Sequence, residues 1–250
     1  MSFFNRLFGA KKKLPPIDIA NLIKVDMHSH LIPGIDDGAQ NMEESIQLIR
    51  SLKEVGYKKI ITTPHVMSDY YRNTPEIIIN GLQNLREELA KQKIEMPIEA
   101  AAEYYLDFDF NDKIRTEELL TFGKKYLLVE VSYLNEPDNI DATIFELQTT
   151  GYNVILAHPE RYPFWGQNFK RFETLKDKDV LFQVNINSLA GHYSPGAKRT
   201  AERLIDLGMV NFIGTDCHNS NHLRFLEEAL CEPALHKLVE SGKLLNHTLQ

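Results

Sequence analysis

Short apolar stretches alternate with longer amphipathic segments along most of the chain. The segment at 41–56 has the apolar spacing of a helix. Asn41 is a suitable N-cap, Glu44 stands at the capping-box position, and Gly56 follows the last apolar turn. The same spacing predicts further helices over 74–93, 112–122, 140–151, 169–178, 195–208 (with Pro195 in its first turn) and 223–242. Strands that alternate with helices through short connections indicate a parallel sheet.

The apolar stretches predict seven buried strands, and most of these run directly into residues that bind metals. These stretches are VDMHSH with His28 and His30, IITTPH with His65, IEAAAE with Glu103, LLVEV with Glu130, VILAHPE with His158, LFQVNINS without a strong ligand, and NFIGTDCH with Asp216 and His218. Because side chains alternate along a strand, His28 and His30 point the same way and can hold one ion together. Mixed imidazole and carboxylate ligands favour Zn, Mn or Fe over Mg or Ca. The pattern therefore predicts a polynuclear metal centre.

Ligands contributed by the first through the last strand can meet only if the strand ends surround a common point. In a barrel the carboxyl ends of the strands form such a ring, whereas an open doubly wound sheet spreads them along an edge. We therefore predict an α/β fold, a seven-stranded TIM-like (β/α)7 barrel. It forms a single domain over residues 21–250, and residues 1–20 form an N-terminal arm.

Composition narrows the class of protein. With 250 residues, 43% of them hydrophobic, the chain can form one sizeable core. Two cysteines cannot build a disulfide framework, and no signal peptide or long apolar run precedes the first strand, so we expect a cytoplasmic protein. A net charge of -7 argues against nucleic acid as a partner. The start, MSFFNRLFGAKKKLPP, is expected to be a frayed or packing arm, with peripheral contact to anionic lipid as the alternative.

Several motifs resemble those of a known family. From Val25 onward the chain contains DMHSHLIPGIDDGA, TPH, AAEYYLD, LVEVSY, AHPERY, QVNINSLAG and GTDCHN. These resemble the PHP (polymerase and histidinol phosphatase) superfamily, and within it the bacterial metal-dependent protein-tyrosine phosphatases of capsule and exopolysaccharide synthesis. The resemblance implies a distorted seven-stranded barrel and hydrolysis of phosphate monoesters. It also implies a phosphotyrosine protein as substrate, with a membrane-associated tyrosine autokinase as the first expectation.

The resemblance also implies three divalent metal ions, with Mn as the first expectation and Fe, Co, Zn or Mg as alternatives. The first site would contain His28, His30, Glu103 and Asp216. Glu103 would bridge to a second site, which Glu130 and His158 would complete. The third site would contain Asp37, His65 and His218. Asp36 is the less favoured of the two adjacent acids. The metals would generate a hydroxide that attacks phosphorus in line with the leaving group. Metal ions can do this because they lower the pKa of a bound water and neutralise negative charge on the phosphoryl group.

Residues that contact the substrate are also suggested by the resemblance. Arg161 in HPERY matches the phosphate-binding arginine of the family, and its planar fork suits a phosphate. The family's second arginine has no match at the same spacing, so either Arg224 or His222 is expected at the phosphate. Four tyrosines next to ligand positions would form an aromatic wall or pack the barrel rim: Tyr104, Tyr105, Tyr133 and Tyr162.

The same residues bear on other possible functions. A cysteine-dependent tyrosine phosphatase needs C-x5-R, whereas Cys217 and Arg224 are separated as C-x6-R. A metal amidohydrolase would place a carbamylated lysine at a strand end, and none of the predicted strand ends offers a lysine. A small-molecule phosphatase, such as one acting on histidinol phosphate, remains the enzymatic alternative. A kinase-binding scaffold without catalysis is the alternative of another class, and the oligomeric state is left open.

Overall fold

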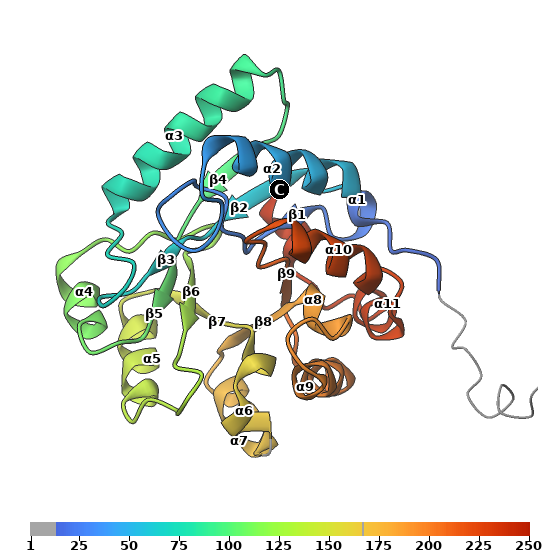
Figure 1. The fold of residues 1–250 in the computed structure, drawn as a ribbon. Helices are drawn as coiled ribbons and strands as arrows, with labels where there is room; N and C mark the ends of the chain where they lie inside the picture. Colours follow the sequence, from blue (N-terminus) through green and yellow to red (C-terminus); the bar gives the residue numbers. More distant parts are fainter. Residues whose placement is uncertain (1–13, 167) are drawn as a thin grey trace, which may run out of the picture.

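Parallel strands curl around a common axis and helices surround them on the outside (Figure 1). The computed structural model describes residues 14–166 and 168–250. Its strands are β1 (Val25–Asp26), β2 (Lys59–Thr62), β3 (His65–Val66), β4 (Ile98–Ala100), β5 (Glu103–Tyr105), β6 (Tyr126–Glu130), β7 (Asn153–Ala157), β8 (Leu181–Asn185) and β9 (Phe212–Gly214). The predicted mixed α/β class with a parallel sheet is confirmed.

The strands form two sheets, with the orders β1-β2-β4 and β3-β5-β6-β7-β8-β9, and all pairs of strands are parallel. β2 and β3 belong to one run of chain that is interrupted at Pro64, which has no N–H to donate to a ladder. Hydrogen bonds continue across the break, since Ala101 N donates to Thr62 O (2.9 Å) and Glu103 N to Pro64 O (3.1 Å). Residues 14–166 and 168–250 thus contain nine strands, and the expected count of seven is not confirmed.

Backbone contacts also join the two ends of the strand series. An isolated parallel bridge pairs Ser29, after β1, with Cys217, after β9. Asp216 N donates to His28 O at 2.8 Å, and His30 N donates to Cys217 O at 3.0 Å. The segments that carry the first and the last predicted ligands therefore lie side by side.

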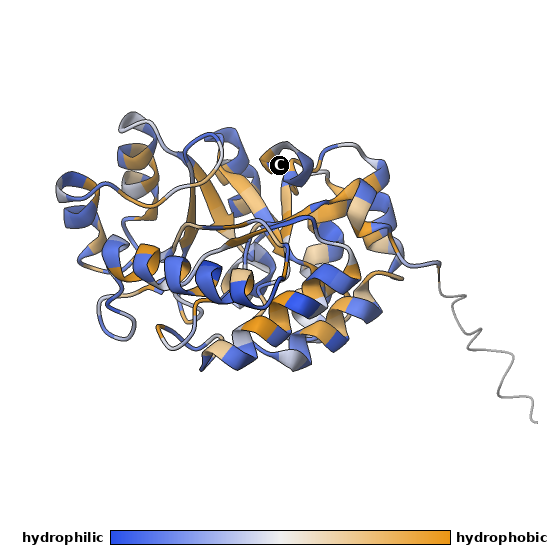
Figure 2. Cartoon of the chain, turned by 90° about the horizontal axis from the view of Figure 1, so that it is seen from above, coloured by the Kyte–Doolittle hydropathy of each residue, from blue (hydrophilic) through white to orange (hydrophobic). Residues whose placement is uncertain are grey.

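The outer layer consists of helices whose polar faces point to solvent (Figure 2). Their bounds are α1 (Ile19–Leu22), α2 (Met42–Val55), α3 (Pro75–Lys91), α4 (Phe110–Thr116), α5 (Ile140–Thr149), α6 (Pro163–Gly166), α7 (Phe169–Asp177), α8 (Ile186–Leu189), α9 (Pro195–Asp206), α10 (Ser220–Ala229) and α11 (Pro233–Glu240), with 3-10 turns η2 (Pro159–Arg161) and η3 (Asn246–Leu249). The predicted cap of α2 is confirmed, because the Asn41 side chain accepts from Glu44 N and Gly56 adopts φ +119°. Pro195 begins α9 as predicted.

Two predicted helices were wrong in extent. The helix expected over 112–122 ends at Thr116, and the following residues lead through a bridge between Phe122 and Tyr126 into β6. The helix expected over 223–242 is divided into α10 and α11, because Pro233 cannot continue a helix and instead begins the next one. The short helices α1, α6 and α8 were not predicted.

The hydrophobic core has two parts. The larger cluster fills the space between the strands and the surrounding helices. The smaller one joins side chains from strands far apart in the series, among them Val25 of β1, Leu128 of β6, Ile155 of β7 and Phe212 of β9, and it includes Leu249 of η3. Strands on opposite sides of the curled sheet therefore face each other across a packed interior.

The predicted N-terminal arm falls mostly outside the described residues, which begin at Leu14. The described part packs on the body of the protein. Ile17 and Ile19 are buried in the larger cluster, and Ile17 N donates to Leu230 O at 2.9 Å. Within the described ranges, none of the helices has the length and apolar character needed to cross a bilayer.

Candidate metal centre

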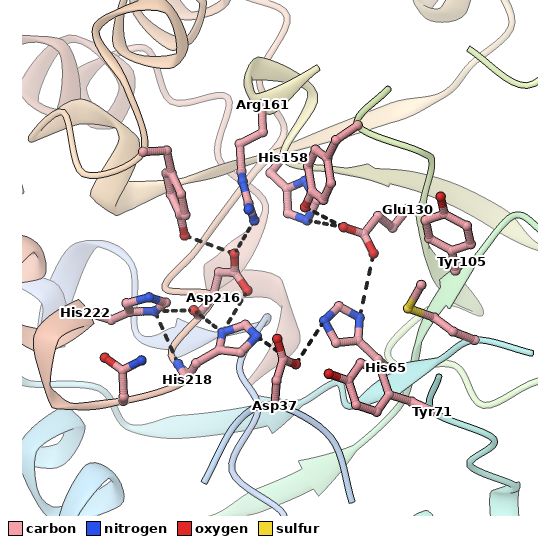
Figure 3. Close-up of a pocket in the computed structure, with 14 residues that line it drawn as sticks. Asp37, His65, Tyr71, Tyr105, Glu130, His158, Arg161, Asp216, His218 and His222 are labelled. Atoms are coloured by element: carbon pink, nitrogen blue, oxygen red, sulfur yellow. Dashed lines mark hydrogen bonds and ion pairs between the residues drawn. The ribbon is translucent and has the colours of Figure 1, made fainter. Parts of the chain in front are cut away.

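The predicted ligands come together at the carboxyl ends of the strands. Six of them line a cavity of about 430 Å³ (Figure 3): Asp37, His65, Glu130, His158, Asp216 and His218. In the described part of the chain, residues that could hold a metal form four overlapping groups: His28, His30 and Asp216; His28, Glu103 and His158; His65, Glu103 and Glu130; and His30, Asp37, His65 and His218. All nine of the predicted metal ligands belong to at least one group.

The first predicted ion site is a compact set of four side-chain atoms. His28 Nε2 lies 3.2 Å from Glu103 Oε2, 3.4 Å from Asp216 Oδ1 and 3.3 Å from His30 Nε2. His30 Nε2 lies 3.4 Å from Glu103 Oε2 and 3.5 Å from Asp216 Oδ1. Ligands about 2.1 Å from a tetrahedral ion are about 3.4 Å from one another. Five of the six separations among these atoms are therefore close to those around a tetrahedral ion, and His28, His30 and Asp216 form one of the groups that could hold it.

Outer hydrogen bonds orient both imidazoles of this set. His28 Nδ1 lies 2.9 Å from Gln183 Oε1, and His30 Nδ1 lies 2.7 Å from Asp36 Oδ2. Because a carbonyl or carboxylate oxygen requires a donor, these contacts place a hydrogen on each Nδ1 and direct each Nε2 to the centre. Asp36 is itself held by the backbone N–H groups of Gly38 and His65. Asp36 thus orients the side chain of His30.

The second predicted set centres on the other oxygen of Glu103. His158 Nε2 lies 2.9 Å from Glu103 Oε1 and 3.6 Å from Glu130 Oε1. Burial, outweighing the nearby carboxylates, lowers the pKa of His158 to about 4, so its imidazole is neutral and keeps a lone pair for a metal. Glu103 faces both sets, which is the arrangement that a bridging carboxylate requires.

The third predicted set lies closest to solvent. Asp37 Oδ1, which is half exposed, lies 3.5 Å from His65 Nε2 and 3.5 Å from His218 Nε2 (Figure 3). His218 Nδ1 contacts Asp216 O at 2.9 Å, which directs its Nε2 to Asp37. His30 stacks on His218 with ring centroids 4.0 Å apart and links this set to the first.

Two site residues have unusual backbone conformations. His158, which follows β7, has φ +30°, and Asp216, which follows β9, has φ +50°. Positive φ costs free energy for a residue with a side chain and is concentrated at functional sites. Both residues are buried at strand ends, so the turn aims their side chains into the cavity while the chain leaves the sheet.

The electrostatics of the site favour cations. Burial alone would lower the pKa of His28, but Glu103 and Asp216 outweigh it and raise the pKa to about 9. Despite its burial, His28 and His218 hold the pKa of Asp216 well below its usual range. A proton on His28 Nε2 would lie between two carboxylates, where a metal ion would otherwise bind and displace it. The residues therefore fit divalent metal ions.

Arg161 is the cationic side chain beside these acids. Its Nη1 lies 3.1 Å from Asp216 Oδ2, and its guanidinium lies between the rings of Tyr133 (4.7 Å) and Tyr193 (4.2 Å). Tyr193 Oη also donates to Asp216 Oδ2 at 3.0 Å. The guanidinium is thus held rigidly at the cavity wall with part of its fork exposed, as phosphate recognition requires.

The other predicted substrate contacts are only partly brought together. His222 lines the cavity, whereas Arg224 does not; Arg224 is exposed on α10, and its Nη2 donates to Asn221 Oδ1. Tyr104 and Tyr162 are buried away from the cavity, contrary to the expectation of an aromatic wall. The hydroxyl of Tyr104 accepts from Leu120 N, and that of Tyr162 donates to Ala157 O.

The aromatic residues that do line the cavity are Tyr71, Tyr105, Tyr133 and Tyr193. Tyr105 lines it and Tyr104 does not because neighbouring side chains of β5 point to opposite sides, and Glu103 already points inward. Tyr71 and Tyr193 were not predicted, since neither adjoins a ligand motif. Gln183 and Asn185 were also not predicted as site residues. The stretch LFQVNINS that contains them was predicted only as a strand without a strong metal ligand.

Cysteine chemistry is disfavoured by the structure as well as by the spacing. Cys217 is fully buried, and burial raises the pKa of its thiol. A buried neutral thiol is a poor nucleophile. Arg224, which would have to close a phosphate loop with it, is exposed on α10.

The comparisons with known proteins agree with this site. A family model for capsular polysaccharide synthesis, CpsB/CapC, matches residues 24–241. The chain belongs to the CpsB/CapC family. Tyrosine-protein phosphatase YwqE of Bacillus subtilis is 29% identical to this CpsB/CapC protein over 208 residues, which is 82% of each chain. Tyrosine-protein phosphatase CpsB of Streptococcus pneumoniae is 26% identical over 201 residues, which is 78% of this chain and 83% of the relative.

A solved structure supports the same relationship. Crystal structures of YwqE from Bacillus subtilis and CpsB from Streptococcus pneumoniae, described as unique metal-dependent tyrosine phosphatases, include a chain that matches this CpsB/CapC protein with a TM-score of 0.79. The two are 28% identical, and the match covers 90% of each chain. The resemblance and the enzyme class predicted from the sequence are therefore confirmed.

Proposed function

We propose that this chain is a metal-dependent phosphate monoester hydrolase that removes phosphate from phosphotyrosine in a protein substrate. The observation that carries the proposal is the convergence of nine imidazole and carboxylate side chains in overlapping groups; six of these side chains line the cavity that Arg161 also lines. Relatives at 26–29% identity that are named tyrosine-protein phosphatases support the substrate class. We further propose that the runs containing β2 with β3 and β4 with β5 each act as one strand of a seven-stranded PHP barrel.

The chain's own groups have separable tasks in this reaction. Divalent ions, when bound, act as Lewis acids that lower the pKa of water towards about 7 and offset phosphoryl charge. Glu103 and Asp216 provide the negative charge that retains such cations, and Gln183 and Asp36 fix the imidazoles that face them. Arg161 presents its fork to two phosphoryl oxygens and neutralises part of the charge that develops on them. A phenolate leaving group, with a pKa near 10, departs without a strong general acid.

The walls of the cavity suit a phenyl ring. Tyr71, Tyr105 and Tyr133 line it next to the metal ligands, and Met67 adds an apolar contact. Aromatic rings gain from offset or edge contacts with one another, so a phosphotyrosine ring would be held with its phosphate directed to Arg161. We propose three ions, with Mn as the first metal to test. The proposed protein substrate is a membrane-associated tyrosine autokinase of capsule or exopolysaccharide synthesis.

A substrate panel under one metal condition tests this function. The purified chain, supplied with Mn, is assayed on a phosphotyrosine peptide, a phosphoserine peptide, a sugar phosphate and histidinol phosphate. We expect the highest kcat/KM on the phosphotyrosine peptide, and we expect a chelator to reduce it by more than about 100-fold, reversibly on return of the metal. Faster hydrolysis of histidinol phosphate would instead favour a small-molecule phosphatase. Stoichiometric metal without turnover of any phosphoester would favour a kinase-binding scaffold.

A further inference from the structure

A second cavity adjoins the metal centre on the side of α9. It has a volume of about 760 Å³ and shares Tyr133, Arg161 and Tyr193 with the catalytic cavity. Its other walls come from α6, from Phe169 at the start of α7, and from one side of α9 between Gly196 and Arg203. A substrate with its phosphate at Arg161 therefore reaches the second cavity directly.

One face of α9 forms the far wall of this cavity. Gly196, Arg199, Thr200 and Arg203 line it, and residues three or four positions apart lie on the same side of a helix. The guanidinium of Arg203 lies 3.7 Å from the centroid of Phe169, which holds it against the wall. Two arginines are thus displayed side by side along the cavity.

The charge of this cavity is opposite to that of the whole chain. Among the described residues that line it, three are arginines and one, Glu160, is acidic, whereas the chain carries a net charge of -7. Glu160 is 3% exposed, and its Oε1 accepts from Asn185 N and Ser188 Oγ, so it is tied to β8 and α8. The N-terminal end of α9 adds a further positive potential.

Arg199 and Arg203 do not form ion pairs with acidic side chains of the described residues. In residues 14–166 and 168–250, arginines form ion pairs with acidic side chains at Arg115, Arg161 and Arg171. The side chains of Arg199 and Arg203 are exposed, and no carboxylate of the described chain lies within ion-pair distance of them. Their guanidinium groups are available to a ligand.

We propose that this second cavity is a specificity subsite that binds carboxylate side chains of the substrate next to the phosphotyrosine, through Arg199 and Arg203. The proposal rests on the proposed function. Successive residues of an extended peptide are about 3.3–3.6 Å apart, so an acidic side chain a few residues from the phosphotyrosine can cross from one cavity to the other. Charge complementarity at such a rim adds rate and selectivity rather than large affinity.

The test compares matched peptides and matched variants in the full-length chain. One phosphotyrosine peptide carries glutamates before the phosphotyrosine, one carries them after it, and a third has glutamine at all of these positions. The wild type is expected to prefer one glutamate peptide over the glutamine peptide by about fivefold in kcat/KM, from two exposed charge pairs. The Arg199→Gln/Arg203→Gln variant is expected to lose this preference, which should also shrink at high salt.

Two controls separate the subsite from general effects. Arg50→Gln/Lys53→Gln removes the same charge from the exposed face of α2 and should retain the preference. The small substrate p-nitrophenyl phosphate does not extend into the second cavity, so the α9 variant should hydrolyse it at nearly the wild-type rate. Because Arg203 also packs on Phe169, the single variant Arg199→Glu is added; it should shift preference towards a peptide with lysines in place of the glutamates.

The possible outcomes are distinct. Equal kcat/KM on the glutamate and glutamine peptides, with normal hydrolysis of p-nitrophenyl phosphate, would overturn the subsite and leave the phosphatase function intact. A preference for a glutamate peptide that survives in the α9 variant would overturn the subsite as well. Absence of hydrolysis of every phosphoester would overturn both proposals.

Discussion

Replacing Glu103 with glutamine should reduce kcat/KM on a phosphotyrosine peptide by more than about 100-fold, because even the outer partners of metal ligands are worth 10–100-fold. Oε2 of this residue lies within 3.4 Å of His28 and His30 and 3.2 Å from His65 Nδ1, and its Oε1 lies 2.9 Å from His158. The glutamine amide has nearly the same shape as the glutamate carboxylate. It lacks the negative charge, however, and its NH2 group would be a hydrogen-bond donor facing the imidazoles. We expect the bound metal, measured by elemental analysis, to fall in parallel.

Glu99→Gln provides the matched control for this change. Glu99 lies four residues earlier on the same run of chain, but its side chain is half exposed and pairs with Lys59 outside the site. It should retain full activity and metal content. A Glu103→Gln variant with wild-type kcat/KM would exclude a bridging role for Glu103, whatever its metal content.

Replacing Arg161 with lysine should lower kcat/KM by about 100-fold, comparable to the loss of one donor that stabilises a transition state. Lysine preserves the positive charge but not the planar fork, nor the stacking between Tyr133 and Tyr193 that positions it. Metal content should stay at the wild-type level, because Arg161 contacts Asp216 without being a ligand. A lower kcat/KM together with unchanged metal content would show that the variant is defective in binding phosphate and not in binding metal.

Arg50→Lys serves as the control, since Arg50 is exposed on α2 and its Nη2 donates to Gln92 Oε1. It should leave hydrolysis unchanged. If Arg161→Lys were as active as Arg50→Lys, the fork geometry of Arg161 would have no part in catalysis.

The sequence was most informative where a local rule determines the outcome. The cap at Asn41, the stop at Gly56 and the start at Pro195 depend on nearby residues, and each was found as predicted. The candidate ligands stand out in the sequence because histidine and acidic residues at the ends of buried strands are costly unless they are paired or bind metals. Asp37, which was ranked above Asp36 as a ligand, faces His65, whereas Asp36 contacts His30.

The sequence was least informative where contacts join distant segments. Gln183 and Tyr193 support His28 and Asp216 only because the register of neighbouring strands and the path of the following loop bring them together. The spacing of residues within a single motif does not determine the register between neighbouring strands. Tyr104 was different, because the alternation of side chains along β5 places it opposite Glu103, and this rule was available from the sequence.

The central claim is that dispersed imidazoles and carboxylates bind a cluster of divalent ions at the ends of the strands. Anomalous diffraction from crystals of this protein grown with Mn tests it most directly. We predict strong anomalous peaks within about 2.0–2.4 Å of His28 Nε2, His158 Nε2 and His218 Nε2, the bond lengths usual for such ligands. Fully ordered side chains at these three histidines with no anomalous peak beside any of them would contradict the account.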